Sequence, residues 1–493
     1  MALAIDAAVK GNFKSLVSTL DNSLRDTVDK NELAQKFKSL EPPGPNVSLS
    51  ISAHSLTSQK IDNITTENTY EVQVTRAFHP LATLKSICKT ITRIQRVHTF
   101  CFIHEIKFEP TDPNENKLPP NGIYNNPEGS PLLPLIQATQ STLDIEIYTM
   151  SDSSLREALR DALKRNVRIR VVKEPSHFAD PCDLFAQPVS PAVPAVVSEH
   201  CLDLRKLVSE IQASPQGAFV PYALCKPGDK FCFQHGKIVI SDNKVVMIST
   251  GNFDASNLCD TKDNPSKCNR DFSYITDEKE IVSTLEAIFE SDLKSIPYDL
   301  SALLTAHNNQ KLTVSPLSLT PLVDFIKSAQ ESIQIENQYL KDPTINQALI
   351  DMAGKKVKVS VTVSSPCSIQ RPTKAEKQAF SEIYTKFDAA GIQSQIFNVS
   401  QLINDNPGYM HAKVIIIDGK RAWMGSVNGS TTSLMHNREF GIFFEDHENV
   451  IKLQNVMQQD FADPRGETWQ DAIECTKDIP SQPIPSRSDT RGG

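Results

Sequence analysis

The chain has 493 residues, of which 39% are hydrophobic and 22% are charged, and its formal net charge is −8. This length and composition are typical of a globular protein with two or three domains, each large enough to bury an apolar core. The acidic balance disfavours a protein that coats nucleic acid through a broad basic face, although a local basic cleft remains compatible with it. No run of eighteen apolar residues occurs, so we expect no membrane-spanning helix.

The two ends of the chain carry no recognisable targeting signal. The opening MALAIDAAVKGNFKSL has no basic start, and Asp6 and Lys10 interrupt its apolar run, so we expect no cleavable secretory signal. The closing SDTRGG offers no lipidation site. The sequence therefore predicts a protein that is cytoplasmic or is exported without a cleavable signal peptide.

Ten cysteines leave the redox state of the chain open. Pairs that are near in sequence, and could form disulfides in an oxidising compartment, are Cys182 and Cys201, Cys225 and Cys232, and Cys259 and Cys268. Cys367 and Cys475 have no such neighbour. Because no export signal is present, we favour reduced structural thiols over disulfides. The spacings CxxC and HExxH are absent, so we expect no zinc site and no other cofactor.

Residues 1–122 are expected to form an N-terminal extension with helical and β segments. Between Val9 and Val28, apolar side chains recur at helical spacing on one face. Alternating residues predict strands at 47–52, 70–74 and 101–108. Turn-forming residues over 111–131 predict a linker. The role of this extension is not indicated by its sequence.

Beyond this linker the sequence repeats itself. Residues 130–174 and 315–363 each contain a helix, a strand, a second helix and a second strand in the same order. Such an order predicts parallel strands joined by crossover helices. We therefore predict an α/β protein of two pseudo-twofold-related repeats, with mixed, largely parallel sheets flanked by helices. The predicted bounds are 123–300 for the first repeat, 301–465 for the second, and 466–493 for a disordered tail.

Each repeat then runs into the same short motif. Residues 235–252 read HGKIVISDNKVVMISTGN and residues 411–428 read HAKVIIIDGKRAWMGSVN, so both begin with His and end with Asn. The apolar run in each predicts a buried strand, which DNK or DGK turns into a returning strand. Two such hairpins at the same place in two repeats are unlike a chance match, and folding each hairpin in half returns its Asn to the neighbourhood of its His.

Side-chain alternation along these strands sorts the polar residues. His235 and Lys237 share one face of the first strand, and Asp242 points to the other, where it is suited to capping or bracing the turn. The equivalent residues of the second copy are His411, Lys413 and Asp418. Lys and Asn are donors suited to a phosphate oxyanion. Two His suit a covalent route in which one attacks and the other transfers protons, and the lysines supply positive charge without a metal.

These motifs resemble the H-x-K-x4-D-x6-G-S-x-N pattern of the phospholipase D superfamily, over about residues 123–450. The second copy matches every fixed position, including Gly425 and Ser426, whereas Ser249 and Thr250 stand at those two places in the first copy. Thr250 keeps the hydroxyl there. The superfamily is built on two such motifs, so the resemblance implies one active site shared by the two repeats.

The resemblance also assigns residues to roles. It implies that Asp271 and Glu439 are the acids that brace the catalytic His. The side chains expected to bind the substrate phosphate are those of Asn252, Asn428, Thr250 and Ser426. The implied mechanism has His235 attack phosphorus to give a phosphohistidine. His411 then serves as the general acid and base.

Two acidic residues and two loops remain open to alternatives. Glu146 and Glu336 occupy matching places on the first strand of each repeat; Glu336 is a candidate pocket residue, but we favour a structural hydrogen bond for both. The Pro-rich segment 175–201 is either a lid over the site or a surface loop packed on its own domain. The segment 256–269 lengthens the first copy and is expected to rim the active-site mouth.

Four functions compete on the sequence alone. We favour a phospholipase D that acts on glycerophospholipids, because IENQYL at 335–340 resembles the lipid-cleaving members. A phosphatidyltransferase such as a cardiolipin synthase is second, a metal-independent nuclease third, and a binding scaffold without activity last. The expected partners are a phospholipid and, peripherally, a membrane surface, and not nucleic acid. The chain is expected to be a monomer that contains an internal pseudo-dimer.

Overall fold

The computed structural model describes residues 49–60, 65–76, 79–93, 96–108, 117–126, 128–175, 182, 184, 199–225, 232–263 and 266–477, and of those up to 108 the backbone. The helix predicted within residues 1–41 lies outside the described residues, as do most of the segment 175–201 and the chain beyond Lys477. Contacts divide the chain into two units, of which one reaches to Lys117 and the other begins at Leu118.

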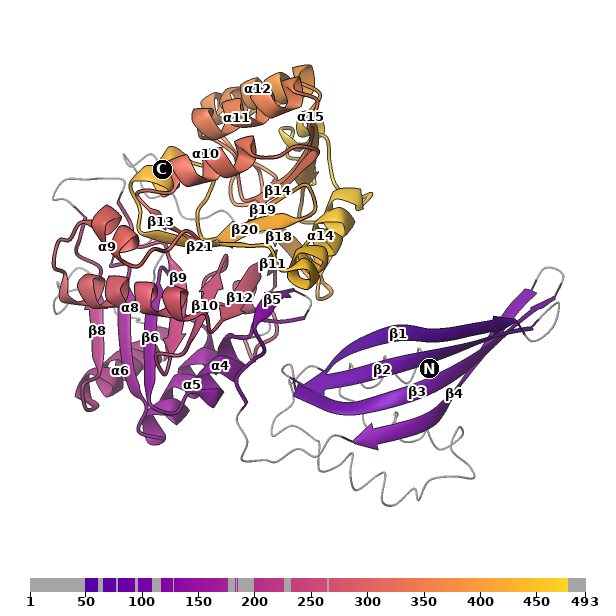
Figure 1. Cartoon of the computed structure of the whole chain (residues 1–493), viewed down its shortest axis with the longest axis horizontal. Helices are drawn as coiled ribbons and strands as arrows, with labels where there is room; N and C mark the ends of the chain where they lie inside the picture. Colours follow the sequence, from indigo (N-terminus) through magenta and orange to yellow (C-terminus); the bar gives the residue numbers. More distant parts are fainter. Residues whose placement is uncertain are drawn as a thin grey trace. The chain divides into compact units, whose positions relative to one another are not determined.

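The N-terminal unit contains a four-stranded antiparallel sheet in the order β1-β2-β3-β4 (Figure 1). Its strands are β1 (Leu49–Lys60), β2 (Thr65–Arg76), β3 (His79–Arg93) and β4 (Arg96–Phe108). The strands predicted at 47–52, 70–74 and 101–108 fall in β1, β2 and β4, but β3 was not predicted. Its apolar Leu81, Leu84, Ile87 and Ile91 recur every three or four residues, as in a helix. Pairing with β2 and β4 on its two sides makes this segment a strand.

The first repeat builds a seven-stranded sheet in the order β5-β12-β10-β9-β6-β7-β8. Its strands are β5 (Gly122–Asn125), β6 (Thr142–Ile147), β7 (Arg168–Lys173), β8 (Ala218–Pro221), β9 (Lys237–Ser241), β10 (Val245–Ser249) and β12 (Phe272–Thr276). The short β11 (Cys268–Arg270) lies in a separate sheet. The helices of the first repeat are α4 (Leu132–Ala138), α5 (Ser153–Lys164), α6 (Glu199–Ala213), α7 (Ala255–Leu258), α8 (Lys279–Lys294) and α9 (Leu300–Ala306).

The second repeat builds a sheet with the same strand order, β13-β21-β20-β19-β14-β15-β16. Its strands are β13 (Leu312–Ser315), β14 (Ser332–Asn337), β15 (Lys358–Ser364), β16 (Gln393–Phe397), β19 (Lys413–Ile417), β20 (Arg421–Gly425) and β21 (Glu439–Phe444). The strands β17 (Leu402–Ile403) and β18 (Asn406–Met410) join β11 in a three-stranded sheet. The helices of the second repeat are α10 (Leu319–Lys327), α11 (Pro343–Gly354), α12 (Lys374–Ala389), α13 (Thr431–Met435), α14 (His447–Ala462) and α15 (Trp469–Ala472). The matching strand orders confirm the duplicated α/β fold.

The two sheets are mixed, as predicted, but most of their strand pairs are antiparallel, whereas a largely parallel sheet was expected. The β-α-β units pair in parallel, β6 with β7 and β14 with β15, and β8 and β16 extend them in parallel. The motif strands β9 and β19 pair antiparallel with β6 and β14, and the strands beyond them are antiparallel too. The reason is that each motif is a hairpin, which adds two antiparallel strands to the centre of its sheet.

Local sequence starts the equivalent helices of the two repeats in the same way. Asp152 caps α5 by accepting from the Leu155 N–H. Asp342 caps α11 by accepting from two backbone N–H groups, and Pro343 follows it in the first turn, where a missing N–H costs nothing. The caps follow the carboxyl ends of β6 and β14, so the next helix crosses back over the sheet.

One hydrophobic core joins the two repeats. It contains apolar residues of β9, β10 and α8 from the first repeat and of β19, β20, β21 and α14 from the second. A separate core lies under α10, α11 and α12, on the other face of the second sheet. The two sheets therefore enclose α8 and α14 between them, while α10, α11 and α12 cover the second sheet from outside (Figure 1). Because neither repeat covers its inner face alone, they form one unit.

The expectation of reduced thiols was wrong. The described residues contain disulfides between Cys182 and Cys201, Cys225 and Cys232, Cys259 and Cys268, and Cys367 and Cys475. The last pair is separated by 108 residues in sequence, so spacing could not reveal it. Folding places Cys367, just after β15, beside Cys475, which follows α15.

The first part of the predicted tail is also ordered. Glu467 pairs with Ile396 at the edge of the second sheet, and α15 packs on α12. Ala472 is buried, and Cys475 is covalently attached. The ordered second repeat therefore extends beyond the predicted boundary at residue 465. Among the described residues, no helix is long and apolar enough to span a bilayer.

Candidate active site

Both motifs form the hairpins that their sequences predict, β9–β10 and β19–β20. The turns require positive φ at two successive residues, Asp242 and Asn243 in the first and Asp418 and Gly419 in the second. Asp, Asn and Gly are the residues that accept this conformation in a two-residue turn. The turn sequences thus explain the strong local signal of the motifs.

The two Asp carboxylates brace the turns, as the alternation of side chains predicts. Asp242 accepts hydrogen bonds from the backbone N–H groups of residues 140–142, and Asp418 accepts from those of residues 330–332. Burial alone would raise the pKa of each carboxyl, but these N–H donors lower it below its usual value. Each Asp therefore ties its hairpin to the start of the neighbouring strand β6 or β14.

Each imidazole is held by an acid from the other repeat. His235 Nδ1 lies 2.8 Å from Glu439 Oε2, and His411 Nδ1 lies 2.9 Å from Asp271 Oδ1. The resemblance implies both acids as braces, and in sequence each acid follows the motif of its own repeat, Asp271 after His235 and Glu439 after His411. In the structure they are exchanged. The exchange brings both motifs into one site, because neither His is complete without the opposite repeat.

The backbone explains the exchange. The Gln234–His235 segment pairs in parallel with Arg438, through the His235 N–H to the Arg438 carbonyl at 2.9 Å. Likewise β18, which leads into His411, pairs in parallel with β11, which leads into Asp271. Each His and the acid that braces it therefore follow paired strand segments from different repeats.

The lysines are completely buried beneath the two imidazoles. Lys237 Nζ donates to the His235 carbonyl, and Lys413 Nζ donates to the His411 carbonyl and, at 3.1 Å, to the carbonyl of Thr250 in the other repeat. Burial lowers the pKa of Lys237 to about 8 and that of Lys413 to about 7. Two buried ammonium groups close to one another favour an anion as their ligand.

The imidazoles are neutral in the free protein. Burial lowers the pKa of His235 and of His411 to about 4 each, against the opposite effect of the bracing acids. Each of the two pKa values is lowered further by the lysines of both motifs, which places the two copies in one electrostatic environment. A neutral imidazole with Nδ1 bonded to a carboxylate presents Nε2 as a nucleophile or base. The side chain of His235 is 14% exposed and that of His411 is 8% exposed.

Side chains that the sequence analysis missed complete the braces. Asn257 donates to Asp271 at 2.7 Å and lies 3.1 Å from His411 Nδ1. Ser433 donates to Glu439 at 2.8 Å. Asn257 and Ser433 each stand five residues after the Asn of their motif. A comparison of the two repeats beyond the motifs therefore carried the signal for both.

Aromatic rings flank the imidazoles. The Tyr148 ring meets His235 edge-on at 4.8 Å between centroids, and the Tyr409 ring stacks at 6.2 Å from His411. Tyr148 also lies below the Lys237 ammonium, 5.6 Å from its Nζ. The positions of the two rings, just after β6 and just before the second motif, carry no spacing signal of their own.

The predicted phosphate contacts divide into two kinds. The hydroxyl of Thr250 is fully buried, donating to Asp271 at 2.7 Å and accepting from the Phe272 N–H at 2.9 Å. Ser426 is equally buried, and its hydroxyl bonds to both backbone groups of Phe440. These bonds hold β10 to Asp271 and the start of β12, and β20 to β21, and phosphate binding by the two hydroxyls stays a prediction.

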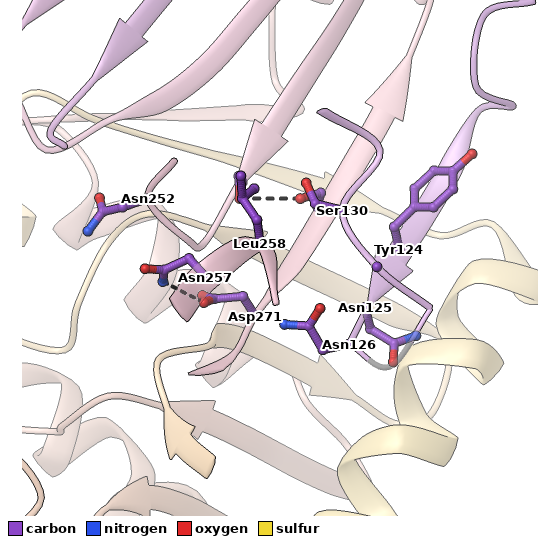
Figure 2. Close-up of a pocket in the computed structure, with 11 residues that line it drawn as sticks. Tyr124, Asn125, Asn126, Ser130, Asn252, Asn257, Leu258 and Asp271 are labelled. Carbon is purple, nitrogen blue, oxygen red and sulfur yellow. Dashed lines mark hydrogen bonds between the residues drawn. The ribbon is translucent and has the colours of Figure 1, made fainter. Parts of the chain in front are cut away.

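Within the described part of the chain, the two motif amides have carbonyl oxygens without a partner, whereas a phosphate oxygen would have to accept from their Nδ2 groups. Asn252 Oδ1 and Asn428 Oδ1 are buried and have no hydrogen-bond partner among the described residues. A small pocket lies beside Asp271, and Asn252 and Asn257 are among the residues that line it (Figure 2). Phosphate binding by Asn252 and Asn428 therefore remains a prediction.

Ser249 stands where the superfamily pattern has Gly, and its partner on the neighbouring strand differs between the two repeats as well. In the second repeat a Cβ at Gly425 would lie 2.5 Å from the Gly441 Cα, so the strands approach closely there. The equivalent pair in the first repeat is Ser249 and Ser273, whose hydroxyls bond at 3.2 Å. The wider pairing thus keeps its polar atoms satisfied.

Glu336 does not line the site. It is fully buried near Arg270 and Asp460, and burial raises the pKa of its carboxyl well above its usual value. The structural role that we favoured for it, and for the equivalent Glu146, agrees with this burial. Within the described part of the chain, no cluster of three His, Cys, Asp or Glu side chains could hold a metal ion.

Similarity to known proteins follows the two repeats. The family described as cardiolipin synthase, PLD-like domain, matches residues 132–293 and 322–461. A protein of Bacillus subtilis named probable cardiolipin synthase is 28% identical over 260 residues, which cover 49% of this chain and 49% of that protein. A phospholipase D of Rickettsia typhi is 32% identical over 129 residues, covering 26% of this chain and 54% of the relative. The chain thus spans about half the length of these two relatives.

Solved structures include one of phosphatidylserine synthase from Haemophilus influenzae Rd KW20. That chain is 13% identical in sequence to this one, and the match covers 69% of this chain and 85% of the synthase chain, with a TM-score of 0.46.

Proposed function

The chain belongs to the PLD-like domain family of the phospholipase D superfamily, and on that premise we propose that it is a phospholipase D-type phosphodiesterase that hydrolyses glycerophospholipids. The products would be phosphatidic acid and the free headgroup alcohol. The observation that carries this proposal is the exchanged pair of His–carboxylate contacts at 2.8 and 2.9 Å, with two buried lysines beneath them. This arrangement offers two imidazoles and concentrated positive charge to one phosphodiester.

The proposed first step is attack by the Nε2 atom of His235 on phosphorus. The bond from phosphorus to the headgroup oxygen breaks, and His411 gives that oxygen a proton. Water then attacks the phosphohistidine, His411 takes its proton, and the bond from phosphorus to nitrogen breaks. Both imidazoles are neutral in the free protein, so His411 needs a proton before it can act as an acid. His411 can take this proton from solvent when the phosphodiester binds, because the negative charge of the phosphodiester raises the pKa of nearby groups.

Lys237 and Lys413 would hold the two non-bridging oxygens, with help from the amides of Asn252 and Asn428. The positive charge is thereby fixed in a buried setting, where it stabilises the transition state more than it would in water. The pseudo-symmetry of the site makes the reverse assignment of His235 and His411 chemically possible, and labelling of the intermediate distinguishes them.

Phosphatidyl transfer is the second candidate, favoured by the similarity to the Bacillus subtilis protein. It shares the first half of the reaction and differs in the acceptor, an alcohol of a second lipid instead of water. A metal-independent nuclease is the third candidate, and the net charge of −8 disfavours it.

One experiment separates these candidates. The purified protein is incubated with labelled phosphatidylcholine, phosphatidylinositol and phosphatidylglycerol vesicles, with and without a primary alcohol, and with plasmid and single-stranded DNA in parallel. Phosphatidic acid in water, partly replaced by a phosphatidyl alcohol when alcohol is present, supports the proposal. Cardiolipin from phosphatidylglycerol would instead identify a transferase, and cleavage of DNA alone would identify a nuclease.

The disulfides support a location for this activity. Four disulfides among the described residues are typical of proteins in oxidising compartments and rare in cytosolic ones. We therefore propose that the chain acts after export, which favours the second of the two locations that the sequence allows. Detection of oxidised Cys367 and Cys475 in protein taken directly from its source, with thiols blocked on lysis, would support export, and free thiols there would contradict it.

A further inference from the structure

A buried arginine stands next to each bracing acid in the sequence. Arg438 precedes Glu439, and Arg270 precedes Asp271. Their side chains are 5% and 8% exposed. A guanidinium has five N–H donors in a rigid planar fork, and burying one without partners is strongly unfavourable. Both arginines must therefore be fully engaged, and the carboxylate that each of them binds comes from the opposite repeat.

Arg438 extends from the second repeat onto helix α8 of the first. Its Nε and Nη2 atoms donate to the two oxygens of Asp292 at 2.8 and 3.2 Å. Nη2 also donates to the Tyr298 hydroxyl at 2.9 Å, and Nη1 to the Ser315 carbonyl at 3.1 Å. The bidentate geometry fixes the guanidinium in orientation as well as in position.

The backbone of the same residue holds the strand that carries His235. The Arg438 N–H donates to the Phe233 carbonyl at 2.8 Å, and the His235 N–H donates to the Arg438 carbonyl at 2.9 Å. One residue therefore connects α8, the segment before His235 and the acid Glu439 that bonds to the imidazole.

Arg270 makes the equivalent connection in the opposite direction. It extends from the first repeat onto α14 of the second, where its Nε and Nη2 donate to the two oxygens of Asp460 at 2.6 and 2.8 Å. Its Nη1 donates to the Asn126 carbonyl. Its own carbonyl accepts from the His411 N–H at 3.2 Å. The two clusters are related by the pseudo-twofold of the repeats.

A second buried carboxyl completes each cluster. Glu146 lies near Arg438 and Asp292 and accepts from Gln234, the neighbour of His235, at 3.0 Å. Glu336 lies near Arg270 and Asp460. Burial and the neighbouring Asp raise the pKa of both Glu carboxyls well above its usual value, which favours a neutral Glu beside each guanidinium.

We propose that Arg270 and Arg438 are positioning residues, which act through the acid that follows each of them to orient the imidazole of the opposite repeat. Arg438 thereby sets Glu439 on His235, and Arg270 sets Asp271 on His411. The effect on catalysis rests on the proposed function, whereas the effect on the two His–carboxylate hydrogen bonds does not. A displacement of about 1 Å in such a group costs on the order of 10²-fold in rate.

The chain supplies a matched control in Arg170. Its guanidinium donates to both oxygens of Asp144 on β6 at 2.7 and 2.5 Å and to Glu290 on α8 at 2.5 Å. It is thus a bidentate arginine between the same strand and helix that hold Glu146 and Asp292. Arg170 comes from β7 of the same repeat, however, and has no contact with a bracing acid. A merely structural role would make Arg170 and Arg438 equivalent.

The test replaces each arginine by lysine, which keeps the charge but loses the planar fork. Arg438→Lys and Arg270→Lys should each lower kcat on a phosphodiester by about 10- to 100-fold, with KM changed less than about threefold. Arg170→Lys should leave kcat within about twofold of wild type. If either lysine variant fails to fold, Asp292→Asn or Asp460→Asn replaces it, because the amide keeps one acceptor for the same arginine.

A second readout does not depend on activity. A proton held between imidazole Nδ1 and a carboxylate gives a low-field proton NMR resonance, and wild type should show two. Arg438→Lys should weaken the His235 resonance alone and Arg270→Lys the His411 resonance alone, while Arg170→Lys keeps both. Each resonance is assigned from its absence in the His→Asn variant.

A third readout separates the two halves. With a nitrophenyl phosphodiester, whose leaving group needs no proton, first-turnover release of nitrophenol should be nearly normal in Arg270→Lys and slow in Arg438→Lys. The reverse pattern would exchange the roles of the two His and keep the inference.

Both NMR resonances and kcat unchanged in Arg438→Lys and Arg270→Lys would overturn the inference. An inactive wild type whose resonances respond as expected would instead reject the proposed function and retain the positioning role.

Discussion

His235 and His411 owe their proposed chemistry to opposing influences on one ring. Burial and the neighbouring lysines keep each imidazole neutral, while a carboxylate from the other repeat fixes its Nδ1 side. The lysines are less stable as cations than in water, since burial lowers their pKa values to about 8 and 7. A bound phosphodiester would relieve this cost. The free site is thus arranged for an anion.

His235→Ala and His411→Ala should each lower kcat by roughly 10³-fold or more, because each removes one half of a joint mechanism. The double variant should be little worse than either single one, since residues that act as a unit are not additive. Steady-state rates of the three variants on the preferred phosphodiester measure this. Single variants that keep about half of the activity would show two independent sites instead.

The pH dependence of kcat/KM should follow the free protein. Above pH 7 the Lys413 ammonium loses its proton, so binding of the phosphate weakens and kcat/KM falls; below about pH 4 the imidazoles become protonated and it falls again. In Lys413→Arg the charge is permanent. The alkaline limb should then move up to about 8, where Lys237 titrates, even if the larger side chain lowers the maximum rate. An alkaline limb that stays near pH 7 in the arginine variant would show that Lys413 is not the titrating group.

At the scale of elements, the third polar residue of each motif works away from the chemistry. Asp242 and Asp418 sit at positive φ in the hairpin turns and accept backbone hydrogen bonds from the start of the neighbouring strand. They set the register of the hairpin against β6 or β14, and through it the depth of the His and Lys at the other end of the strand.

Asp418→Ala should therefore reduce stability and not chemistry. Losing the acceptor of three backbone N–H groups should cost about 1–3 kcal/mol in the free energy of unfolding. kcat at 25 °C should change less than about threefold. Denaturant unfolding and steady-state kinetics measure the two effects. Asp405→Ala, in the exposed turn between β17 and β18, is the control: it places alanine at a similar positive φ, so it should lose less stability than Asp418→Ala and leave kcat unchanged. A large loss of kcat in the folded Asp418→Ala protein would instead implicate this Asp in catalysis.

At the scale of the whole molecule, one disulfide joins two segments that are far apart in the chain, with Cys367 after β15 and Cys475 after α15. The Cys367–Cys475 bond closes 108 residues, whereas Cys225–Cys232 closes seven. A longer loop loses more entropy in the unfolded chain when it is cross-linked.

The double variant Cys367→Ser/Cys475→Ser should thus lose about 2–5 kcal/mol of stability, and the double variant of Cys225 and Cys232 should lose less. Denaturant unfolding without reductant compares them with wild type. Equal losses in the two double variants would show that loop length does not determine the effect here.

The whole site should also work without a metal. We expect the two lysines to supply the positive charge that a metal would otherwise place beside the phosphate, so activity should persist in excess EDTA. Rates before and after dialysis against the chelator measure this, at fixed ionic strength. Loss of activity that zinc or magnesium restores would reject the site as proposed. Calcium needs a separate check, because it can bridge the protein to anionic lipid without entering the chemistry.

Local sequence determined much of the fold and of the site. The β-α-β order, the hairpins and their turn residues, and the placement of His235, Lys237, His411 and Lys413 all follow from periodicity and spacing within short segments. These signals survive in sequence because the side chains on one strand or in one turn are near one another in the chain. The duplication strengthens each of these sequence signals, because both copies follow the same pattern.

Tertiary structure alone decided which repeat supplies the acid that bonds to each motif His. Spacing pairs Asp271 with His235, but the paired segments β11 and β18 carry Asp271 to His411 and leave His235 to Glu439. The disulfide of Cys367 and Cys475, the strand identity of β3 and the burial of Thr250 have the same origin. Each depends on contacts between segments far apart in the chain, and the free energy of such contacts leaves no periodic trace in the sequence around either partner.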